Sequence, residues 1–288
     1  MAYVQSLRWE EAISHHRRAL ELRQEAGDEL GEAMSLNALG LAHLREHRLD
    51  EARDHFERSL ATARRLGERR WEGIALGNLA DALLDSGDPQ EAAAMAEEAA
   101  AIHGETGNRM SEFACLACLG AAWRELGRTD RALSWTQRAL DAARELDNSV
   151  REGFALLELG RLHVLPEQLE EALACFHEAA SLHRRIGDHV REAEAFEGVG
   201  EAYQALERPG EAAKSYRQAA HGYRRHRDRW KLAVCLGRLA SAVTATDPET
   251  ARGHWREALE ALEGFSDPRA LRLREEISGH VRDGPAPS

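Results

Sequence analysis

A pair of cysteines at helical spacing is the combination in this chain best suited by residue type to bind a metal ion or to exchange electrons. Cys115 and Cys118 form a single CxxC, and no second pair stands at the spacing of a zinc site. Leu116 and Leu119 lie beside them in an apolar helical pattern. We therefore interpret both cysteines as small hydrophobic core residues.

Histidines at helical spacing offer metal ligands as well, but each arrangement is incomplete. His43 and His47 are four residues apart at a predicted helix end, and His43 falls in a repeating column that elsewhere holds large core side chains. The segment 177–181 reads HEAAS, which begins like a zinc-protease helix and ends in serine where the second ligand is needed. His15 and His16 are adjacent, so a helix points them about 100° apart. We predict no metal site.

Nucleotide binding and nucleophilic catalysis lack their sequence motifs. Lys214 and Lys231 are the two lysines, and neither follows a glycine, so the phosphate-binding loop GxxxxGK[ST] is absent. No GxSxG turn is present. We predict that the chain is not an enzyme and needs no cofactor.

Composition narrows the class of protein further. The 288 residues include 38 Lys+Arg and 50 Asp+Glu, a formal charge of −12, and 43% are hydrophobic. This apolar fraction is globular, and no uncharged run reaches the roughly eighteen residues of a membrane helix. The acidic balance argues against direct nucleic-acid binding, and we interpret the basic run 224–227 as a solvated helix end.

Cysteine usage and the first residues indicate a compartment. Four cysteines in so long a chain are typical of a reducing cytosol, and the first eight residues lack the basic and apolar regions of a secretory signal. We therefore predict a cytoplasmic protein. The 36 arginines that accompany the two lysines point to a GC-rich bacterium.

An internal repeat of 40 residues is the dominant pattern of the chain. Alanine recurs at this period, and so do a column of glycine or alanine and a column of leucine or valine. The three columns are Ala12, Ala52, Ala92, Ala132, Ala172 and Ala212; Gly40, Ala80, Gly120, Gly160, Gly200 and Ala240; and Leu39, Leu79, Leu119, Leu159, Val199 and Leu239.

Each repeat reads as two amphipathic helices, because its apolar residues follow a helical and not an alternating period. Short turns such as 86–88 join the two helices, and glycines such as Gly27 and Gly187 end each repeat. Asp88 and Pro89 predict an N-cap and a first helical residue. Small residues let the helices of a hairpin approach while Phe56 and its counterparts fill the space alongside. Since one hairpin cannot bury both its faces, we predict an all-α, right-handed superhelical solenoid of antiparallel helix pairs with a C-terminal capping helix.

The repeat register divides the chain. We predict a partial repeat over residues 1–28, mainly a second helix; six repeats over 29–268; a capping helix over 269–282; and a disordered tail over 283–288. The incomplete opening repeat leads us to expect a segment of a longer protein, with its natural end at the C-terminus.

The repeat resembles the tetratricopeptide repeat. The residues that carry the resemblance are Leu39-Gly40-x-x-His43 followed by Ala52-x-x-x-Phe56, with tyrosines at 203 and 216 in a later unit. It covers residues 2 to about 264. The 40-residue period is similar to that of the Pins/LGN polarity adaptors and, more closely given the arginine bias, to the C-terminal arms of actinobacterial signal-transduction ATPases and Streptomyces antibiotic regulatory proteins.

The resemblance implies that the first helix of each hairpin lines a concave groove for a protein partner. Asn78 and Asp81 resemble the asparagine ladder that holds a peptide backbone in the polarity adaptors, whereas the lysine clamp for a terminal carboxylate is missing. The mixed charges suit a peptide or helix that carries both positive and negative residues. In the alternative, these polar residues only hydrate a concave face that binds no partner. The predicted groove residues are Asn37, Asn78, Asp81, Arg124, Glu158, Arg161, Glu197, Glu201 and Arg238.

By this resemblance the chain is a non-catalytic interaction scaffold, the C-terminal sensor or regulatory arm of a multidomain bacterial transcriptional regulator. It would bind a protein partner, or the upstream ATPase and DNA-binding domains of its own chain. Two alternatives stay open: a stand-alone adaptor or homo-oligomer, and a small-molecule sensor whose cavity would use Trp123 and Phe154. No membrane partner is predicted.

Overall fold

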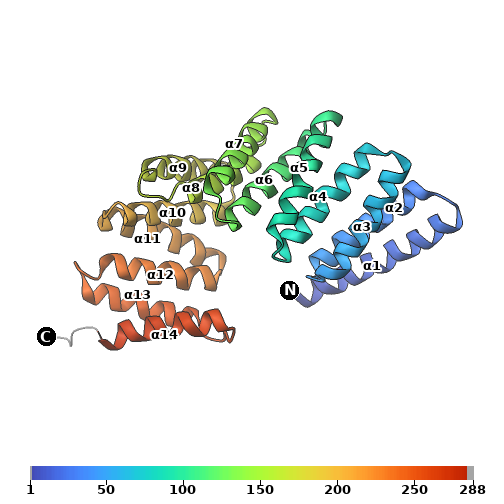
Figure 1. Cartoon of the computed structure of the whole chain (residues 1–288). Coiled ribbons are helices and arrows are strands. Elements are labelled where there is room, and N and C mark those ends of the chain that lie inside the picture. Colours follow the sequence, from blue (N-terminus) through green and yellow to red (C-terminus); the bar gives the residue numbers. More distant parts are fainter. Residues whose placement is uncertain (1, 284–288) are drawn as a thin grey trace. The chain divides into compact units, whose positions relative to one another are not determined.

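The computed structural model describes residues 2–283, which form fourteen helices and no strand (Figure 1). They divide into two compact units, residues 1–147 with α1–α7 and residues 148–288 with α8–α14. The helices are α1 Ala2–Glu25, α2 Glu29–Arg45, α3 Leu49–Leu66, α4 Arg69–Asp85, α5 Pro89–Thr106, α6 Arg109–Glu125, α7 Thr129–Glu145, α8 Ser149–Leu162, α9 Leu169–Ile186, α10 His189–Ala205, α11 Pro209–His226, α12 Arg229–Val243, α13 Pro248–Ala261 and α14 Pro268–Asp283. The predicted tail lies, from residue 284 on, outside the described residues.

Within each unit, consecutive helices pack against one another. In the first unit, α2 packs on α3, α4 on α5 and α6 on α7; in the second, α8 packs on α9, α10 on α11 and α12 on α13. The first helices of successive pairs also meet, α2 with α4, α4 with α6 and α8 with α10. We call these first helices, with α12, the inner helices. This stack of antiparallel pairs confirms the predicted all-α solenoid within each unit.

The glycine column marks where the two helices of a pair approach most closely. A Cβ atom added at Gly40 would lie 2.5 Å from the Phe56 ring, and one added at Gly160 would lie 2.6 Å from the Phe176 ring. The alanines of the other column, from Ala52 to Ala212, are completely buried. The repeated small residues are therefore packing positions, as their period predicts.

Capping side chains start most of the inner helices. The side chains of Asp28, Asn108, Asn148, Asp188 and Asp228, at a 40-residue period or a multiple of it, each accept a hydrogen bond from a backbone N–H of the first turn. The residue before each is the left-handed helix stop, a glycine at 27, 107 and 187. Asp88 is the N-cap residue of α5 and Pro89 begins the helix, as predicted, but the Asp88 side chain makes no capping hydrogen bond, and its Oδ2 lies 3.9 Å from Nη1 of Arg53.

Buried histidines sit among the apolar side chains. His43 is 2% exposed, His103 is 1% exposed and His183 is fully buried. Neither ring nitrogen of His43 or His183 has a hydrogen-bond partner within the described part of the chain. Burial lowers the pKa of all three histidines below the ordinary value of 6.5.

The buried histidines predict that stability falls on mild acidification. Near pH 6.5 these histidines take up protons in the unfolded chain, whereas in the folded chain the buried rings stay neutral because their pKa is lowered. The free energy of unfolding therefore decreases as the pH drops from about 7.5 to about 5.5. Replacing His103 and His183 with alanine, the residue at the equivalent positions 63 and 143, should flatten this slope, measured as the urea midpoint against pH. The exposed His177→Ala is the control, and an unchanged slope in the double variant would contradict the prediction.

Candidate functional site

All nine residues predicted to line a groove lie on the inner helices. In the first unit, Asn37 is on α2, Asn78 and Asp81 are on α4 and Arg124 is on α6; in the second, Glu158 and Arg161 are on α8, Glu197 and Glu201 are on α10 and Arg238 is on α12. The two units are described separately, because each forms its own set of contacts.

In the first unit, two asparagines join neighbouring repeats. The Asn78 side-chain amide donates a hydrogen bond to the Asn37 side-chain oxygen at 2.9 Å. Asn37 is buried and Asn78 is half-buried. The amide pair thus links α2 to α4, and its members stand 41 residues apart in the chain.

Asp81 lies three residues after Asn78 on α4, and the pKa of its carboxyl group is raised. Its side chain reaches solvent, but the surrounding protein replaces much of its hydration and raises the pKa of the carboxyl to about 6. The thiol of Cys118 hydrogen-bonds to this carboxyl and opposes the rise. Burial also raises the pKa of Cys115 to about 12, so both members of the CxxC are protonated thiols at neutral pH, without the thiolate that redox chemistry requires.

The second unit carries a charged network across three inner helices. Arg161 pairs with Glu158 of its own helix and approaches Glu194 of α10, with 3.7 Å between Nη2 and Oε2. Lys231 of α12 also pairs with Glu194. Arg238 of α12 donates to Glu197 at 2.6 Å and pairs with Glu201. We call these seven residues the inner network: Glu158, Arg161, Glu194, Glu197, Glu201, Lys231 and Arg238.

All members of the inner network except Glu158 line an open cavity of about 230 Å³. Trp230 and Val234 of α12 add apolar wall, and Phe176 of α9 closes the base beside Gly198. The cavity therefore combines paired charges of both signs with aromatic surface, which suits a protein segment of mixed character.

Burial shifts the pKa of Glu197, the carboxyl group at the centre of the inner network. The side chain of Glu197 is 15% exposed, and its burial raises the pKa of the carboxyl above the ordinary value. Tyr223 donates its hydroxyl to Glu197 at 2.6 Å, and this bond and the charge of Arg238 oppose the rise. Although burial works against it, the carboxylates of Glu201 and Glu197 raise the pKa of Arg238. Glu197 and Arg238 therefore each favour the charged form of the other.

Sequence reasoning missed Glu194, Lys231 and Tyr223. The spacing of Glu194, Glu197 and Glu201 at i, i+3 and i+7 was the available signal, because it places three carboxylates on one face of a helix. Tyr223 gave no such signal, since its hydroxyl reaches Glu197 from the second helix of the pair.

The described residues contain neither a metal-binding cluster nor a membrane-spanning helix. Among residues 10–282, whose side chains the structure describes, no group of three or more His, Cys, Asp and Glu side chains is arranged to hold a metal ion. In the same range no helix combines the length and the apolar character needed to cross a membrane.

Comparison with known proteins agrees with this architecture. The tetratricopeptide repeat model matches residues 1–65, 32–104 and 167–225. No curated protein matches the chain in sequence.

Solved structures share the fold at low sequence identity. BtubC from P. vanneervenii is 18% identical with a TM-score of 0.67, and the match covers 76% of this chain and 92% of that one. A signal-transduction ATPase with numerous domains and a tetratricopeptide repeat sensor, from Pyrococcus horikoshii, is 15% identical with a TM-score of 0.76, covering 93% of this chain and 41% of that one. RapI in its apo form is 13% identical with a TM-score of 0.76, covering 98% of this chain and 82% of that one.

At these identities the structural likeness establishes the fold alone, whereas the family model covers more than half of the sequence. The 40-residue hairpins, the close-packed small columns and this match lead to one conclusion. The chain belongs to the tetratricopeptide repeat family.

Proposed function

We propose that this chain is a cytoplasmic, non-catalytic scaffold whose inner helices bind a segment of a partner protein or of upstream domains of its own chain. The observation that carries the proposal is the convergence of α8, α10 and α12 on the cavity of the inner network, beside Trp230. Charged groups of three successive repeats meet there, so a bound segment would contact several repeats at once.

The chemistry of the cavity defines the kind of segment. Each cation is already paired with a carboxylate, so a ligand must exchange one intramolecular ion pair for another. A segment with residues of both signs can replace both halves of a pair and leave no buried charge unpartnered. In the first unit, the half-buried Asn78 carries an amide group that can hydrogen-bond to a peptide backbone.

We assign the scaffold to the C-terminal sensor arm of a multidomain bacterial transcriptional regulator. Its support is the likeness in fold to a signal-transduction ATPase that has a tetratricopeptide repeat sensor, together with the arginine-rich composition. The match covers 41% of the whole ATPase chain. In such an arm, binding at the inner face would alter the contacts available to the upstream domains.

Selection from a displayed peptide library tests the inner-face site. Arg161 and Lys231 are suitable targets because both approach Glu194 and their side chains are 40% and 38% exposed. Peptides enriched on the wild type should carry both acidic and basic residues. They should bind the Arg161→Ala/Lys231→Ala variant at least tenfold more weakly in fluorescence anisotropy, since the cations that pair with their acidic residues are gone.

The control removes two exposed cations of α14 that do not line the cavity, as Arg269→Ala/Arg272→Ala, and should leave the affinity within twofold of the wild type. Circular dichroism confirms that the variants fold. Selected peptides that bind both variants as tightly as the wild type would contradict the inner-face assignment.

A further inference from the structure

A second groove lies outside the inner network, between α9 and α11. Two adjoining cavities of about 350 and 420 Å³ share Arg184, Phe196 and Gln218 as lining residues, so they form one elongated channel. We call it the outer groove. Its walls are the second helices of two successive pairs, and its floor is the face of α10 that carries Phe196 and Tyr203.

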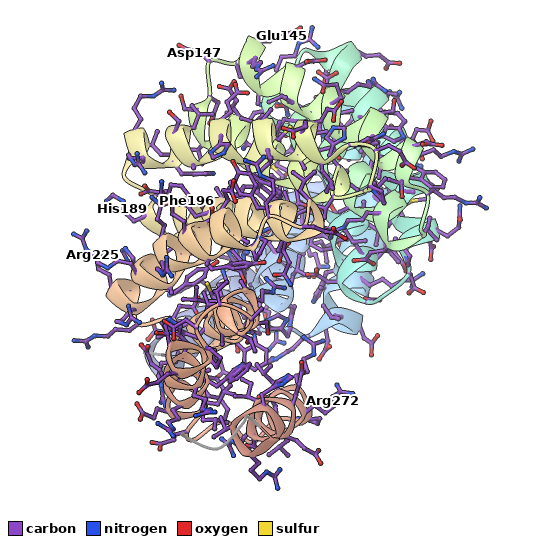
Figure 2. All side chains as sticks on the ribbon, turned by 90° about the vertical axis from the view of Figure 1, so that its left-hand side faces the viewer. Glu145, Asp147, His189, Phe196, Arg225 and Arg272 are labelled. Atoms are coloured by element: carbon purple, nitrogen blue, oxygen red, sulfur yellow. The ribbon has the colours of Figure 1, made fainter. Side chains whose placement is uncertain are left out.

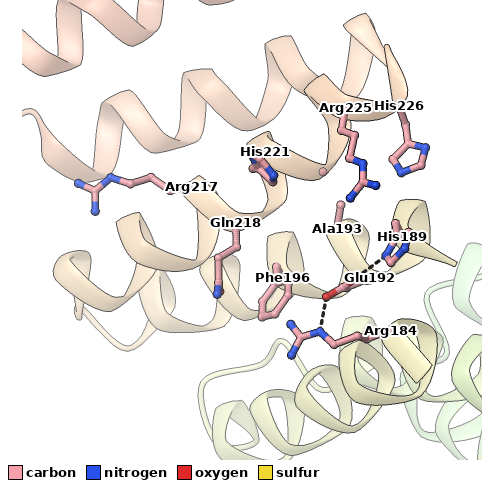
Figure 3. Close-up of a pocket in the computed structure, with 11 residues that line it drawn as sticks. Arg184, His189, Glu192, Ala193, Phe196, Arg217, Gln218, His221, Arg225 and His226 are labelled. Atoms are coloured by element: carbon pink, nitrogen blue, oxygen red, sulfur yellow. Dashed lines mark hydrogen bonds and ion pairs between the residues drawn. The ribbon is translucent and has the colours of Figure 1, made fainter. Parts of the chain in front are cut away.

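Most of the charged side chains that line the outer groove are cations. Lys214, Arg217 and Arg225 stand on one face of α11, and none of them forms an ion pair with any of residues 10–282, whose side chains the structure describes. Arg184 lines the opposite wall on α9. Figure 3 shows Arg225 extending from α11 toward His189 at the start of α10, and Gln218 extending toward Phe196.

Little negative charge offsets these cations. Glu192 accepts a hydrogen bond from Arg184 at 2.6 Å and contacts His189 at 2.9 Å, so its carboxylate is already engaged. Although its burial opposes the effect, these contacts hold the pKa of Glu192 below the ordinary value. Glu211, at the far end, pairs with Arg208. The unpaired cations of α11 therefore face a groove without free carboxylates, on a chain whose net charge is −12.

The repeat itself shows that packing does not require this basic stripe. Lys214, Arg217, His221 and Arg225 occupy the columns that Ala94, Glu97, Ala101 and Glu105 occupy in α5, 120 residues earlier. Both helices fold in the same way with opposite charge on this face. On the same helix, Gly222 takes the place of the buried Ile102 and Leu182 of other repeats, and a Cβ atom added there would lie 2.6 Å from the Cβ atom of Ala193 on α10.

We propose that the outer groove binds a short acidic peptide segment of a partner protein, with an apolar side chain resting on Phe196 between the cations of α9 and α11. Lys214 and Arg225 are 11 residues apart on α11, or about 16 Å at the helical rise, which an extended segment of about five residues spans. An elongated channel with an aromatic floor fits such a segment better than a compact anion. The site is separate from the inner network and does not depend on the function proposed for it.

A fluorescein-labelled pentapeptide of four glutamates around a central leucine is the probe, titrated with the whole chain at low salt. It should bind with a Kd in the micromolar range, and its affinity should fall at least tenfold at about 300 mM salt, because exposed charges are screened. The Arg217→Glu/Arg225→Glu variant should weaken binding at least tenfold. Figure 2 shows Arg225 close to His189 and Phe196, and Arg272 on α14 away from them, so Arg269→Glu/Arg272→Glu is a control of equal charge that should change the Kd less than twofold.

Three further measurements distinguish this binding site from the inner network and the peptide from other ligands: the Phe196→Ala variant, an inner-network variant and a comparison with RNA. The Phe196→Ala variant should bind the leucine peptide at least threefold more weakly while leaving the affinity for a peptide with a central glycine unchanged. The Arg161→Ala/Lys231→Ala variant of the inner network should bind the probe like the wild type. The proposal is overturned if the wild type does not bind the peptide, if both charge reversals weaken it equally, or if a single-stranded RNA of matched charge binds more tightly.

Discussion

Alanine in place of Gly200 should destabilise the second unit by about 1–3 kcal/mol, the usual effect of forcing one extra methyl group into a packed contact. A Cβ atom there would lie 2.5 Å from a ring carbon of Tyr216, which is 1% exposed and has no space to retreat. Moving the ring would also stretch its hydroxyl bond to Gln204, now 3.1 Å. Urea unfolding followed by circular dichroism measures the change.

Two comparisons make this result specific to the helix contact. Gly210→Ala, in the first turn of α11, places a Cβ atom with nothing within 4 Å and should be neutral or slightly stabilising. In a Tyr216→Ala background the Gly200→Ala penalty should disappear, since the pair then matches Ala80 and Ala96 of another repeat. A penalty that survives in that background would show that the small column is not set by the facing ring.

Those packing columns are the part of the fold that the sequence predicts best. A small residue is needed where a ring stands opposite, so the requirement recurs in several repeats and contributes to the 40-residue period. Gly40 against Phe56 and Gly160 against Phe176 are two instances of one contact. The caps are harder to predict, because Asp88 has the residue type of a cap but its side chain is near Arg53 instead.

The candidate site could be predicted only in part, because its charges are not repeated. Column position correctly placed Arg161 and Arg238 on inner helices, since helix phase decides which face a residue occupies. Their partners depend on how long side chains of neighbouring repeats meet, and Glu194 was missed for that reason. The outer groove could not be predicted for the same reason. In the sequence, the basic run that contains Arg225 is typical of an ordinary helix end, and only the structure shows that it lines the same groove as Lys214 and Arg217.

Removing the charge of Arg238 tests whether the inner network also holds the repeats together. Arg238→Gln leaves the carboxylates of Glu197 and Glu201 without their cation, and Glu197 is 15% exposed, so water compensates poorly. Because 40% of the Arg238 side chain still faces solvent, we expect a loss of about 1–3 kcal/mol at pH 7.5 and not the larger effect of a fully buried pair.

The pH dependence of this loss identifies its cause. Burial already raises the pKa of Glu197, and loss of the arginine raises it further, because a counter-charge that favoured the carboxylate is removed. As the pH falls through this raised pKa, Glu197 takes up a proton in the folded variant and the unpaired charge disappears. The stability difference between variant and wild type should therefore shrink between about pH 7.5 and about pH 5, while the buried histidines affect both proteins alike and cancel. A difference that stays constant over this range would mean that Arg238 stabilises the unit through the packing of its stem, and not through its charge.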